Sequence, residues 1–190
     1  MTTRLILVRH GQTPYAREKR YCGLSDIGLD DKGIKEAKAL RKRLCRKNIQ
    51  EVYSSDLKRA LDFAKIIFEN SSIKSTAQLR EMNFGIFEGL TYGEIMEKYP
   101  EIYTKWLNDP LITRIPRAES WVEFRRRIKR TLIKMIKLNK NKTLAIVTHA
   151  GPIRIILSDI LRTKDIWQIN PDTASLNIIE YKNKKARLVE

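Results

Sequence analysis

Short apolar runs alternate along the chain with longer segments in which apolar residues recur every three or four positions. The runs at 5–8 and 143–148 have the length and composition of buried strands. Helical spacing recurs in four segments, at residues 34–44, 56–69, 121–135 and 153–161. Strands that alternate with helices predict an α/β fold, a doubly wound three-layer sandwich around a mostly parallel central sheet.

Weaker patterns complete the predicted element order. We expect short strands at 51–54 and 73–79, and a terminal hairpin from 174–181 and 186–189, split by the basic stretch 182–185. Residues 14–30 and 80–90 are expected to be loops.

Two capping-box patterns predict helix starts in the middle of the chain. Thr91 with Glu94 and Ser120 with Glu123 have the required spacing, and Pro100 allows a further short helix to begin. We expect one domain over residues 1–190, with a helical insert at about 91–138 that caps the functional site.

Composition indicates a soluble globular protein, because 42% of the residues are hydrophobic and 32% are charged. We see no signal peptide, and no segment approaches the roughly 20 apolar residues of a membrane span. Cys22 and Cys45 are too few for a disulfide framework or a zinc site, so we expect reduced thiols in a cytoplasmic protein. The sequence does not reveal the oligomeric state.

The net charge of +16 leaves two interpretations open. A basic nucleic-acid-binding protein without catalytic activity is one. Against it, the basic residues are spread along several helices and the C-terminal segment, without the interleaved aromatic residues of a nucleic-acid surface. We therefore expect a solvated basic surface and no nucleic-acid partner. Such a surface would also attract a small anionic ligand.

The two histidines occupy matching positions. His10 and His149 each follow a predicted buried strand, and each is followed within two residues by glycine. A single histidine at a strand end is more often structural than catalytic. Because ligands of open α/β sheets bind at the carboxyl ends of the strands, two such histidines indicate a common site.

Four stretches of the chain resemble one family in their sequence and order. Residues 9–13, RHGQT, resemble the R-H-G-x-[ST] motif of the histidine phosphatase superfamily, the phosphoglycerate-mutase-like enzymes. The stretches YSSDLKRA at 53–60, LREMNFG at 79–85 and VTHAG at 147–151 match in the family's order. Because these blocks extend over most of the chain, it is identified as a member by resemblance.

The resemblance implies that His10 attacks phosphorus and becomes a phosphohistidine, which water then hydrolyses. Neutral imidazole is a competent nucleophile near neutral pH. Arg9 and Arg59 would bind the phosphoryl oxygens through their forked guanidinium groups. His149 would hydrogen-bond the transferring group, and Gly11 would let the phosphate approach the backbone.

The remaining site residues follow from the same resemblance. Glu81 would protonate the leaving oxygen and then act as a base for water, with Glu88 as the fallback. The backbone N–H of Ala150 opens a helix, where phosphate is favoured. Gln12 and Thr13 are expected to contact the same phosphate. This scheme requires no metal ion and no cofactor, and its partner is a small-molecule phosphomonoester.

The stretches at 81–91 and 106–110 most resemble the α-ribazole phosphatases of cobalamin assembly, which implies a nucleotide-like 5′-phosphate. The mutase branch of the family usually has a longer chain that shields the phosphoenzyme, so a chain ending at 190 favours hydrolysis. A phosphoglycerate mutase and a metal-independent phosphoserine phosphatase stay as alternatives. Tyr15-Ala16 stands where the family often has Trp-Asn, and Arg117-Ala118 where many relatives have Gly-Gly.

Overall fold

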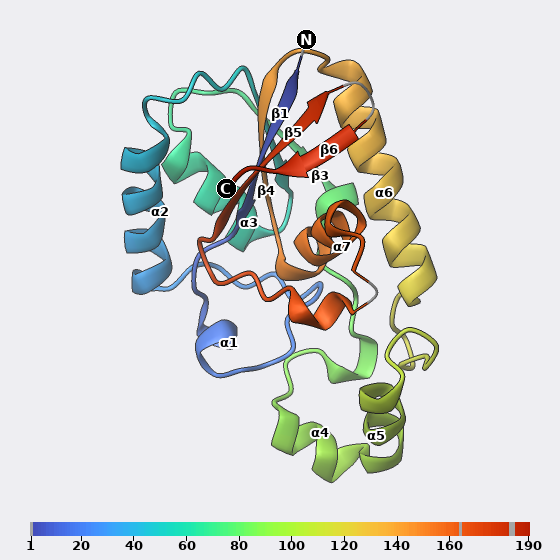
Figure 1. Cartoon of the computed structure of the whole chain (residues 1–190). Coiled ribbons are helices and arrows are strands. Elements are labelled where there is room, and N and C mark those ends of the chain that lie inside the picture. Colours follow the sequence, from blue (N-terminus) through green and yellow to red (C-terminus); the bar gives the residue numbers. More distant parts are fainter. Residues whose placement is uncertain (1, 164, 183–184) are drawn as a thin grey trace.

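A computed structural model describes residues 2–163, 165–182 and 185–190, and these form a six-stranded sheet covered by helices on both faces (Figure 1). The strands are β1 (Thr3–Arg9), β2 (Glu51–Ser55), β3 (Ile73–Thr76), β4 (Thr143–Thr148), β5 (Leu176–Lys182) and β6 (Lys185–Leu188). Their order across the sheet is β3-β2-β4-β1-β5-β6. The first four in this order pair in parallel, and β5 and β6 each pair antiparallel. The predicted α/β sandwich with a mostly parallel sheet is confirmed.

The helices that build the outer layers and the far end of the molecule are α1 (Pro14–Arg17), α2 (Asp31–Leu44), α3 (Lys58–Ile67), α4 (Tyr92–Lys98), α5 (Pro100–Asn108), α6 (Trp121–Leu138) and α7 (Ala150–Leu161). Short 3₁₀ turns lie at η1 (Ala77–Leu79), η2 (Gly85–Phe87) and η3 (Ile166–Gln168).

Successive side chains of β1 point to opposite faces of the sheet, and each face packs against one pair of helices. Leu5 and Leu7 join the cluster that contains residues of α6 and α7. Ile6 and Val8 join the cluster built with α2 and α3. All four side chains are fully buried, as expected for a parallel strand covered on both faces. Figure 1 shows α2 and α3 on one side of the sheet and α6 and α7 on the other.

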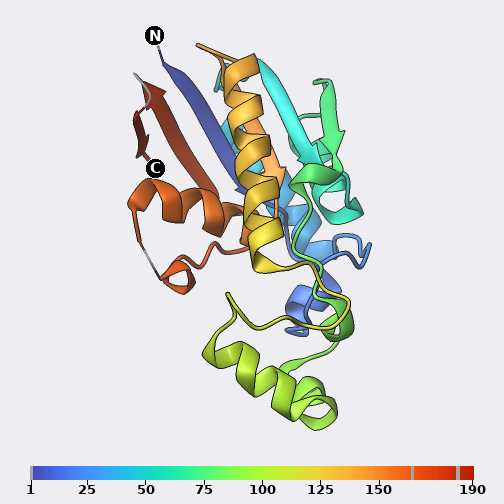
Figure 2. The same ribbon diagram turned by 90° about the vertical axis from the view of Figure 1, so that its right-hand side faces the viewer.

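The segment expected to cap the site divides into two parts. Helices α4 and α5 pack around a small separate cluster that includes Phe87, Ile95, Tyr103 and Trp106. Figure 2 shows these two helices beyond the end of the sheet. Helix α6 instead lies on the sheet, through buried residues such as Phe124. That the segment 91–138 caps a bound substrate stays a prediction.

Local sequence signals account for most element boundaries. Both capping boxes form, with the side chains of Thr91 and Ser120 each accepting the backbone N–H three residues later. The expected strand 73–79 is wrong at its C-terminal end, because β3 stops at Thr76. There the threonine side chain accepts the backbone N–H of Gln78 and turns the chain into η1. Residues 183 and 184 of the expected hairpin turn lie outside the described residues.

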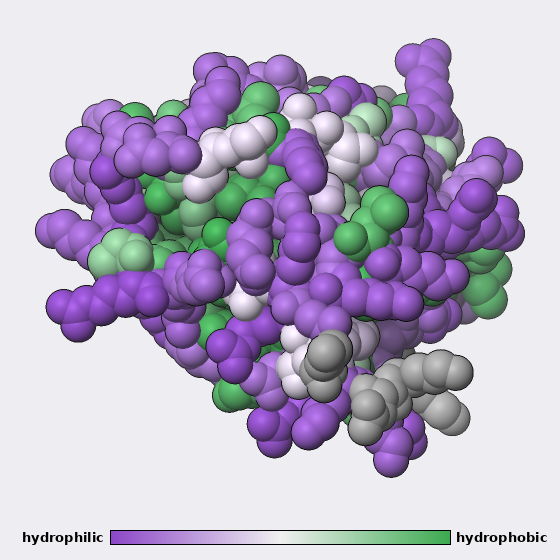
Figure 3. Space-filling view, turned by 90° about the horizontal axis from the view of Figure 1, so that it is seen from above, coloured by the Kyte–Doolittle hydropathy of each residue, from purple (hydrophilic) through white to green (hydrophobic). Residues whose placement is uncertain are grey.

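The expected loop at 14–30 begins with the one-turn helix α1, which has Pro14 at its first position and Thr13 as its cap. Seen from the end of the sheet opposite α4 and α5, the molecular surface is mostly hydrophilic (Figure 3). Within the described ranges, no helix combines the length and the apolar character needed to cross a membrane.

Candidate active site

The two histidines meet because β1 and β4 are neighbouring parallel strands. The register pairs Arg9 with Thr148, so the residue after each strand emerges at the same edge. The backbone N–H of His10 donates to the carbonyl of Thr148 at 3.0 Å. The imidazole rings of His10 and His149 are 5.0 Å apart between centroids and meet edge to face. The sheet edge thus brings together side chains 139 positions apart in the sequence.

The hydrogen bonds of His10 define its tautomer. Its Nδ1 lies 2.8 Å from the carbonyl oxygen of Gly11, which can only accept, so Nδ1 carries the proton. Its Nε2 then has a lone pair, which accepts a long hydrogen bond of 3.3 Å from Nε of Arg59. Burial, and then the charges of Arg59 and Arg9, hold the pKa of His10 well below its ordinary value. His10 is therefore neutral at pH 7, with its nucleophilic nitrogen directed toward a cation.

Arg59 is buried at the start of α3 although it is charged, with 1% of the residue exposed. Its guanidinium donates to the carbonyls of Ser25 at 2.8 Å and Gly23 at 2.7 Å. These bonds compensate for the loss of water around the cation. Residues 53–60 contain the end of β2 and the start of α3. This connection brings Arg59 to the site, as the sequence predicts.

The loop 22–25, whose backbone carbonyls accept hydrogen bonds from Arg59, is in turn fixed by Glu88. The Glu88 carboxylate accepts hydrogen bonds from the backbone N–H groups of Gly23, Leu24 and Ser25, and from that of Phe84. It also accepts from the hydroxyl of Ser25 at 2.7 Å. Both carboxylate oxygens are thus engaged in fixing loop geometry.

His149 is fully buried and is oriented by Ser55 at the end of β2. The Ser55 Oγ lies 2.8 Å from Nε2 of His149 and accepts the backbone N–H of Leu57 at 3.3 Å. We assign the hydroxyl hydrogen of Ser55 to the bond with Nε2, so that the ring proton lies on Nδ1. Among the described residues Nδ1 has no hydrogen-bond partner. Burial, then the charge of Arg59, holds the pKa of His149 well below its ordinary value, so Nδ1–H is a neutral donor.

Arg9 supplies a second buried donor. Its Nη1 donates to the carbonyl of Pro171 at 2.7 Å, while its Nε is buried without a partner among the described residues. Burial lowers the pKa of Arg9, yet a guanidinium stays charged in proteins. A buried unsatisfied donor costs about 1–3 kcal/mol. An anion with several acceptor oxygens would satisfy the Arg9 Nε and the His149 Nδ1 together.

Glu81 lies against the first turn of α7, beside His149. One carboxylate oxygen accepts the backbone N–H of Gly151 at 2.9 Å, and the other accepts that of Met82 at 2.9 Å. A Cβ at position 151 would overlap the Glu81 carboxylate and press on the ring of Phe124. Glycine at this position therefore leaves room for the Glu81 carboxyl group at the start of α7, where it accepts a backbone N–H.

The other predicted contact residues lie around this cluster. An added Cβ at Gly11 would collide with the ring of Phe63, so the backbone there is closely packed. The hydroxyl of Thr13 accepts the N–H of Ala16 as the cap of α1. The backbone N–H of Gln12 donates to Glu36 at 2.8 Å. Ala150 is the first residue of α7. Their contacts with a ligand stay predictions.

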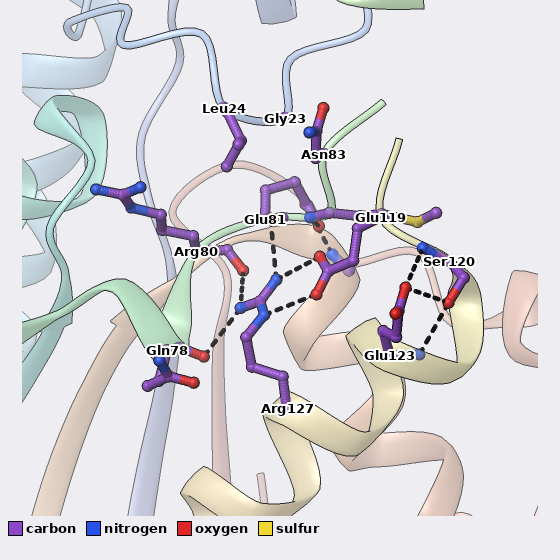
Figure 4. A network of polar contacts seen from close by, with 12 residues as sticks. Gly23, Leu24, Gln78, Arg80, Glu81, Asn83, Glu119, Ser120, Glu123 and Arg127 are labelled. Atoms are coloured by element: carbon purple, nitrogen blue, oxygen red, sulfur yellow. Dashed lines mark hydrogen bonds and ion pairs between the residues drawn. The ribbon is translucent and has the colours of Figure 1, made fainter. Parts of the chain in front are cut away.

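Sequence reasoning missed a network that fixes the loop carrying Glu81 (Figure 4). Arg127 of α6 donates to the carbonyls of Gln78 and Arg80 at 3.0 Å each, and to that of Glu81 at 3.3 Å. Glu119 holds the same guanidinium through two hydrogen bonds of 2.9 and 2.7 Å. Arg127 is one of five basic residues within positions 125–130 and shows no local sign of this role.

Sequence reasoning also missed the segment that follows α7. The carbonyl of Ile169 accepts from Nε of Arg154 at 2.7 Å, and the Asn170 side chain accepts from the same guanidinium at 3.1 Å. The guanidinium of Arg154 lies 5.1 Å from the ring centroid of Trp167. Only the position of Arg154 in the first half of α7, the helix that begins directly after His149, could have drawn attention to it.

No group of three or more His, Cys, Asp and Glu side chains within residues 2–163, 165–182 and 185–190 could hold a metal ion. The polar groups that converge here are instead guanidinium N–H groups, two imidazoles and one carboxylate. This set fits an anion with several oxygens and a neighbouring group that exchanges a proton.

We predict that stability falls as the pH drops from 7 to 5. In the unfolded chain both histidines take up a proton near their ordinary pKa of about 6.5, whereas the folded protein holds both pKa values well below it. Between these limits the unfolded state binds more protons, so lowering the pH favours unfolding by up to about 1.4 kcal/mol per pH unit for each histidine. Urea unfolding across this range measures the slope. His149→Asn should remove about half of it, and a flat wild-type profile would contradict the buried neutral state.

Comparisons with known proteins agree with the geometry. Residues 5–190 match the histidine phosphatase superfamily (branch 1). Phosphoserine phosphatase 1 of Hydrogenobacter thermophilus is 31% identical over 96% of this chain and 88% of its own length.

Solved structures show the same likeness over nearly the whole chain. The α-ribazole phosphatase of Shigella flexneri has a TM-score of 0.92 at 25% identity, covering 98% of this chain and 94% of its own. The phosphoserine phosphatase of Entamoeba histolytica, solved with 3-phosphoglyceric acid, has a TM-score of 0.88 at 25% identity, covering 99% and 95%. Together with the family match, these findings show that the chain belongs to the histidine phosphatase superfamily.

Proposed function

We propose that this phosphatase hydrolyses small phosphomonoesters through a phosphohistidine formed at Nε2 of His10. The single observation that carries the proposal is the hydrogen-bonding of His10. Its Nδ1–H donates to the carbonyl of Gly11, its Nε2 accepts from Arg59, and its ring lies against that of His149. A neutral, oriented nucleophile beside buried donors is what phosphoryl transfer requires.

In the first step, Nε2 of His10 attacks phosphorus while the bond between phosphorus and the ester oxygen breaks. The protonated carboxyl of Glu81 gives its proton to the departing oxygen, so that an alcohol leaves instead of an alkoxide. Nε of Arg9 and Nδ1–H of His149 donate to the phosphoryl oxygens, whose negative charge the guanidinium of Arg59 also stabilises.

In the second step, the Glu81 carboxylate takes a proton from water while the water oxygen attacks phosphorus. The bond from Nε2 to phosphorus breaks, inorganic phosphate leaves, and His10 regains its lone pair. Glu81 thus ends the cycle protonated, as it began. We assign this proton transfer to Glu81 and not to Glu88, because the Glu88 carboxylate is engaged by five hydrogen bonds from the protein.

The proposal extends to α-ribazole 5′-phosphate as substrate, and therefore to cobalamin assembly in the cytoplasm. It is supported by the sequence likeness at 81–91 and by the similarity to the S. flexneri phosphatase. Phosphoserine is the second candidate, favoured by the 31% identity to the H. thermophilus phosphoserine phosphatase. A phosphoglycerate mutase activity would instead need a bisphosphate primer. We propose no nucleic-acid or membrane partner.

We predict that phosphate release survives EDTA and is abolished by His10→Ala. The reason is that the nucleophile is a side chain and the phosphate ligands are guanidinium and imidazole groups. The assay is phosphate release from a panel that contains α-ribazole 5′-phosphate, phosphoserine, 3-phosphoglycerate and a nitrophenyl ester. Full inhibition by EDTA, or unchanged turnover in His10→Ala, would reject the mechanism. Primer-dependent isomerisation without hydrolysis would identify a mutase.

We predict that Glu81→Gln loses activity unevenly across substrates. Removing a general acid costs about 10²–10⁴-fold when the leaving group is a poor one such as an alkoxide. A nitrophenolate leaves without a proton, so the loss with the nitrophenyl ester should be at least tenfold smaller. Steady-state kcat on an alkyl and a nitrophenyl ester tests this. Equal losses on both esters would remove Glu81 from the proton-donor role, and Glu88→Gln provides the comparison.

We predict that Arg127→Gln weakens catalysis through Glu81. Without the guanidinium, the carbonyls of Gln78, Arg80 and Glu81 lose their common donor, and a displacement of the acid by about 1 Å can cost about 100-fold. We expect kcat for an alkyl ester to fall at least tenfold, with a smaller loss for the nitrophenyl ester. Arg126→Gln, which changes an exposed neighbour on α6, is the matched control. Parallel losses in both variants would refute the positioning role.

A further inference from the structure

The peptide group between Gly11 and Gln12, here the 11–12 peptide group, is hydrogen-bonded at both ends. Its carbonyl oxygen lies 2.8 Å from Nδ1 of His10, and its N–H donates to the carboxylate of Glu36 on α2 at 2.8 Å. A trans peptide group is planar, so its C=O and N–H bonds point in opposite directions and turn together. The acceptor that fixes the N–H therefore also fixes the carbonyl that receives the Nδ1 proton of His10.

The start of α2 packs closely enough against this backbone for Glu36 to reach it. Gly33 lies three residues before Glu36 on the same helix, and an added Cβ there would overlap the carbonyl oxygen of Gln12. An added Cβ at Gly11 would lie 2.8 Å from the carbonyl oxygen of Gly33. The two glycines thus let α2 approach the turn after β1, and the Glu36 side chain spans the remaining distance to the 11–12 peptide group.

The second carboxylate oxygen of Glu36 binds a different segment. It accepts a hydrogen bond from the hydroxyl of Thr173 at 3.1 Å. The backbone N–H of the next residue, Ala174, donates to the carbonyl of His10 at 3.2 Å. One carboxylate thus has one bond to the turn that carries His10 and one bond to a neighbouring segment. Because the two bonds have different donors, each can be removed without the other.

The proposed reaction gives the 11–12 peptide group an electrostatic role. When Nε2 of His10 bonds to phosphorus, the Nδ1 proton stays on the ring, which becomes positively charged. Burial and then the charges of Arg59 and Arg9 lower the pKa of His10 and so disfavour this charge, whereas the hydrogen bond to Gly11 raises the pKa. The carbonyl directs the negative end of the peptide dipole at the ring. A carboxylate that accepts the N–H of the same group makes the carbonyl a stronger acceptor.

We propose that Glu36 is a positioning residue that acts on His10 through the 11–12 peptide group. It orients the imidazole ring, and it stabilises the positive charge that the ring gains in the phosphoenzyme. In a Ser-His-Asp triad the carboxylate bonds to the imidazole directly, whereas here a peptide group lies between the two. The inference rests on the proposed function and deepens it by adding a residue that contacts neither the substrate nor the reacting atoms.

The test measures phosphoenzyme formation in the first turnover, from nitrophenolate release after rapid mixing with a saturating nitrophenyl ester. Glu36→Met keeps the length and helix propensity of the side chain but removes the acceptor, so we expect the first-turnover rate to fall at least tenfold. Glu36→Gln keeps an acceptor oxygen for the N–H of Gln12 and should recover most of that rate. Thr173→Val is the matched control, because it removes only the second bond of the carboxylate, and its loss should be much smaller.

Two further measurements separate this role from a merely structural one. The affinity for inorganic phosphate should stay close to that of the wild type in all three variants, because the side chains that bind phosphate are unchanged. In the NMR spectrum, the Nδ1–H proton of His10 should move upfield in Glu36→Met, since its bond to the Gly11 carbonyl weakens. In Glu36→Gln this shift should be much smaller.

The outcomes distinguish the inference from the function on which it rests. A first-turnover rate in Glu36→Met equal to that of the wild type would overturn the inference, and so would an equal loss in Thr173→Val or no recovery in Glu36→Gln. Phosphate binding lost together with the rate would show a general collapse of the site and would also overturn it. Failure of the wild type to release nitrophenolate would instead overturn the proposed function.

Discussion

The site depends on the parallel pairing of β1 with β4, which are far apart in the sequence and adjacent in the sheet. The pairing of Arg9 with Thr148 brings His10 and His149 to one edge, ring against ring. A shift of one residue would exchange the two faces of β1 and break both hydrophobic clusters. The core that stabilises the sheet therefore also fixes the register on which the chemistry depends.

Burial has a second consequence, which is the charge state of the site. Burial, and then the neighbouring cations, hold the pKa of both histidines well below its ordinary value. The buried guanidinium of Arg59 is compensated by backbone carbonyls of the 22–25 loop. Glu88 orders that loop. The Glu88 carboxylate thus fixes the loop, the loop carbonyls fix Arg59, and Arg59 donates to Nε2 of His10. Among the described residues, Nε of Arg9 and Nδ1 of His149 are buried without a hydrogen-bond partner, and these are the two atoms that we propose bind the phosphoryl group.

Much of the fold follows from local signals in the sequence. The apolar runs identify β1 and β4, and the capping boxes place the starts of α4 and α6 to the residue. The ends of β1 and β4 and the start of α3 converge at one edge of the sheet. This convergence made it possible to predict the cluster of His10, His149, Arg9 and Arg59. The resemblance added Glu81, whose loop has no periodic pattern of its own.

Contacts between distant segments of the chain could not be predicted from the sequence. Ser55 and His149 are 94 positions apart, and nothing near Ser55 in the sequence indicates that its hydroxyl hydrogen-bonds the ring of a histidine. In the sequence, Arg127 cannot be distinguished from the other basic residues of its helix. In the structure it donates hydrogen bonds to three backbone carbonyls of the loop that carries Glu81. A pocket beside Glu81 is lined by residues of α5, α6, α7 and η3. Such sites arise only after the sheet has fixed where each segment lies.

The most direct test of the central claim is long-range ¹H–¹⁵N NMR of the imidazoles, because the chain has two histidines and the spectrum is correspondingly simple. At pH 7 we predict two neutral rings, each protonated at Nδ1, with the unprotonated Nε2 of His10 assigned by comparison with His10→Ala. A doubly protonated His10, or a proton on its Nε2, would remove the lone pair from the attacking position and contradict the account.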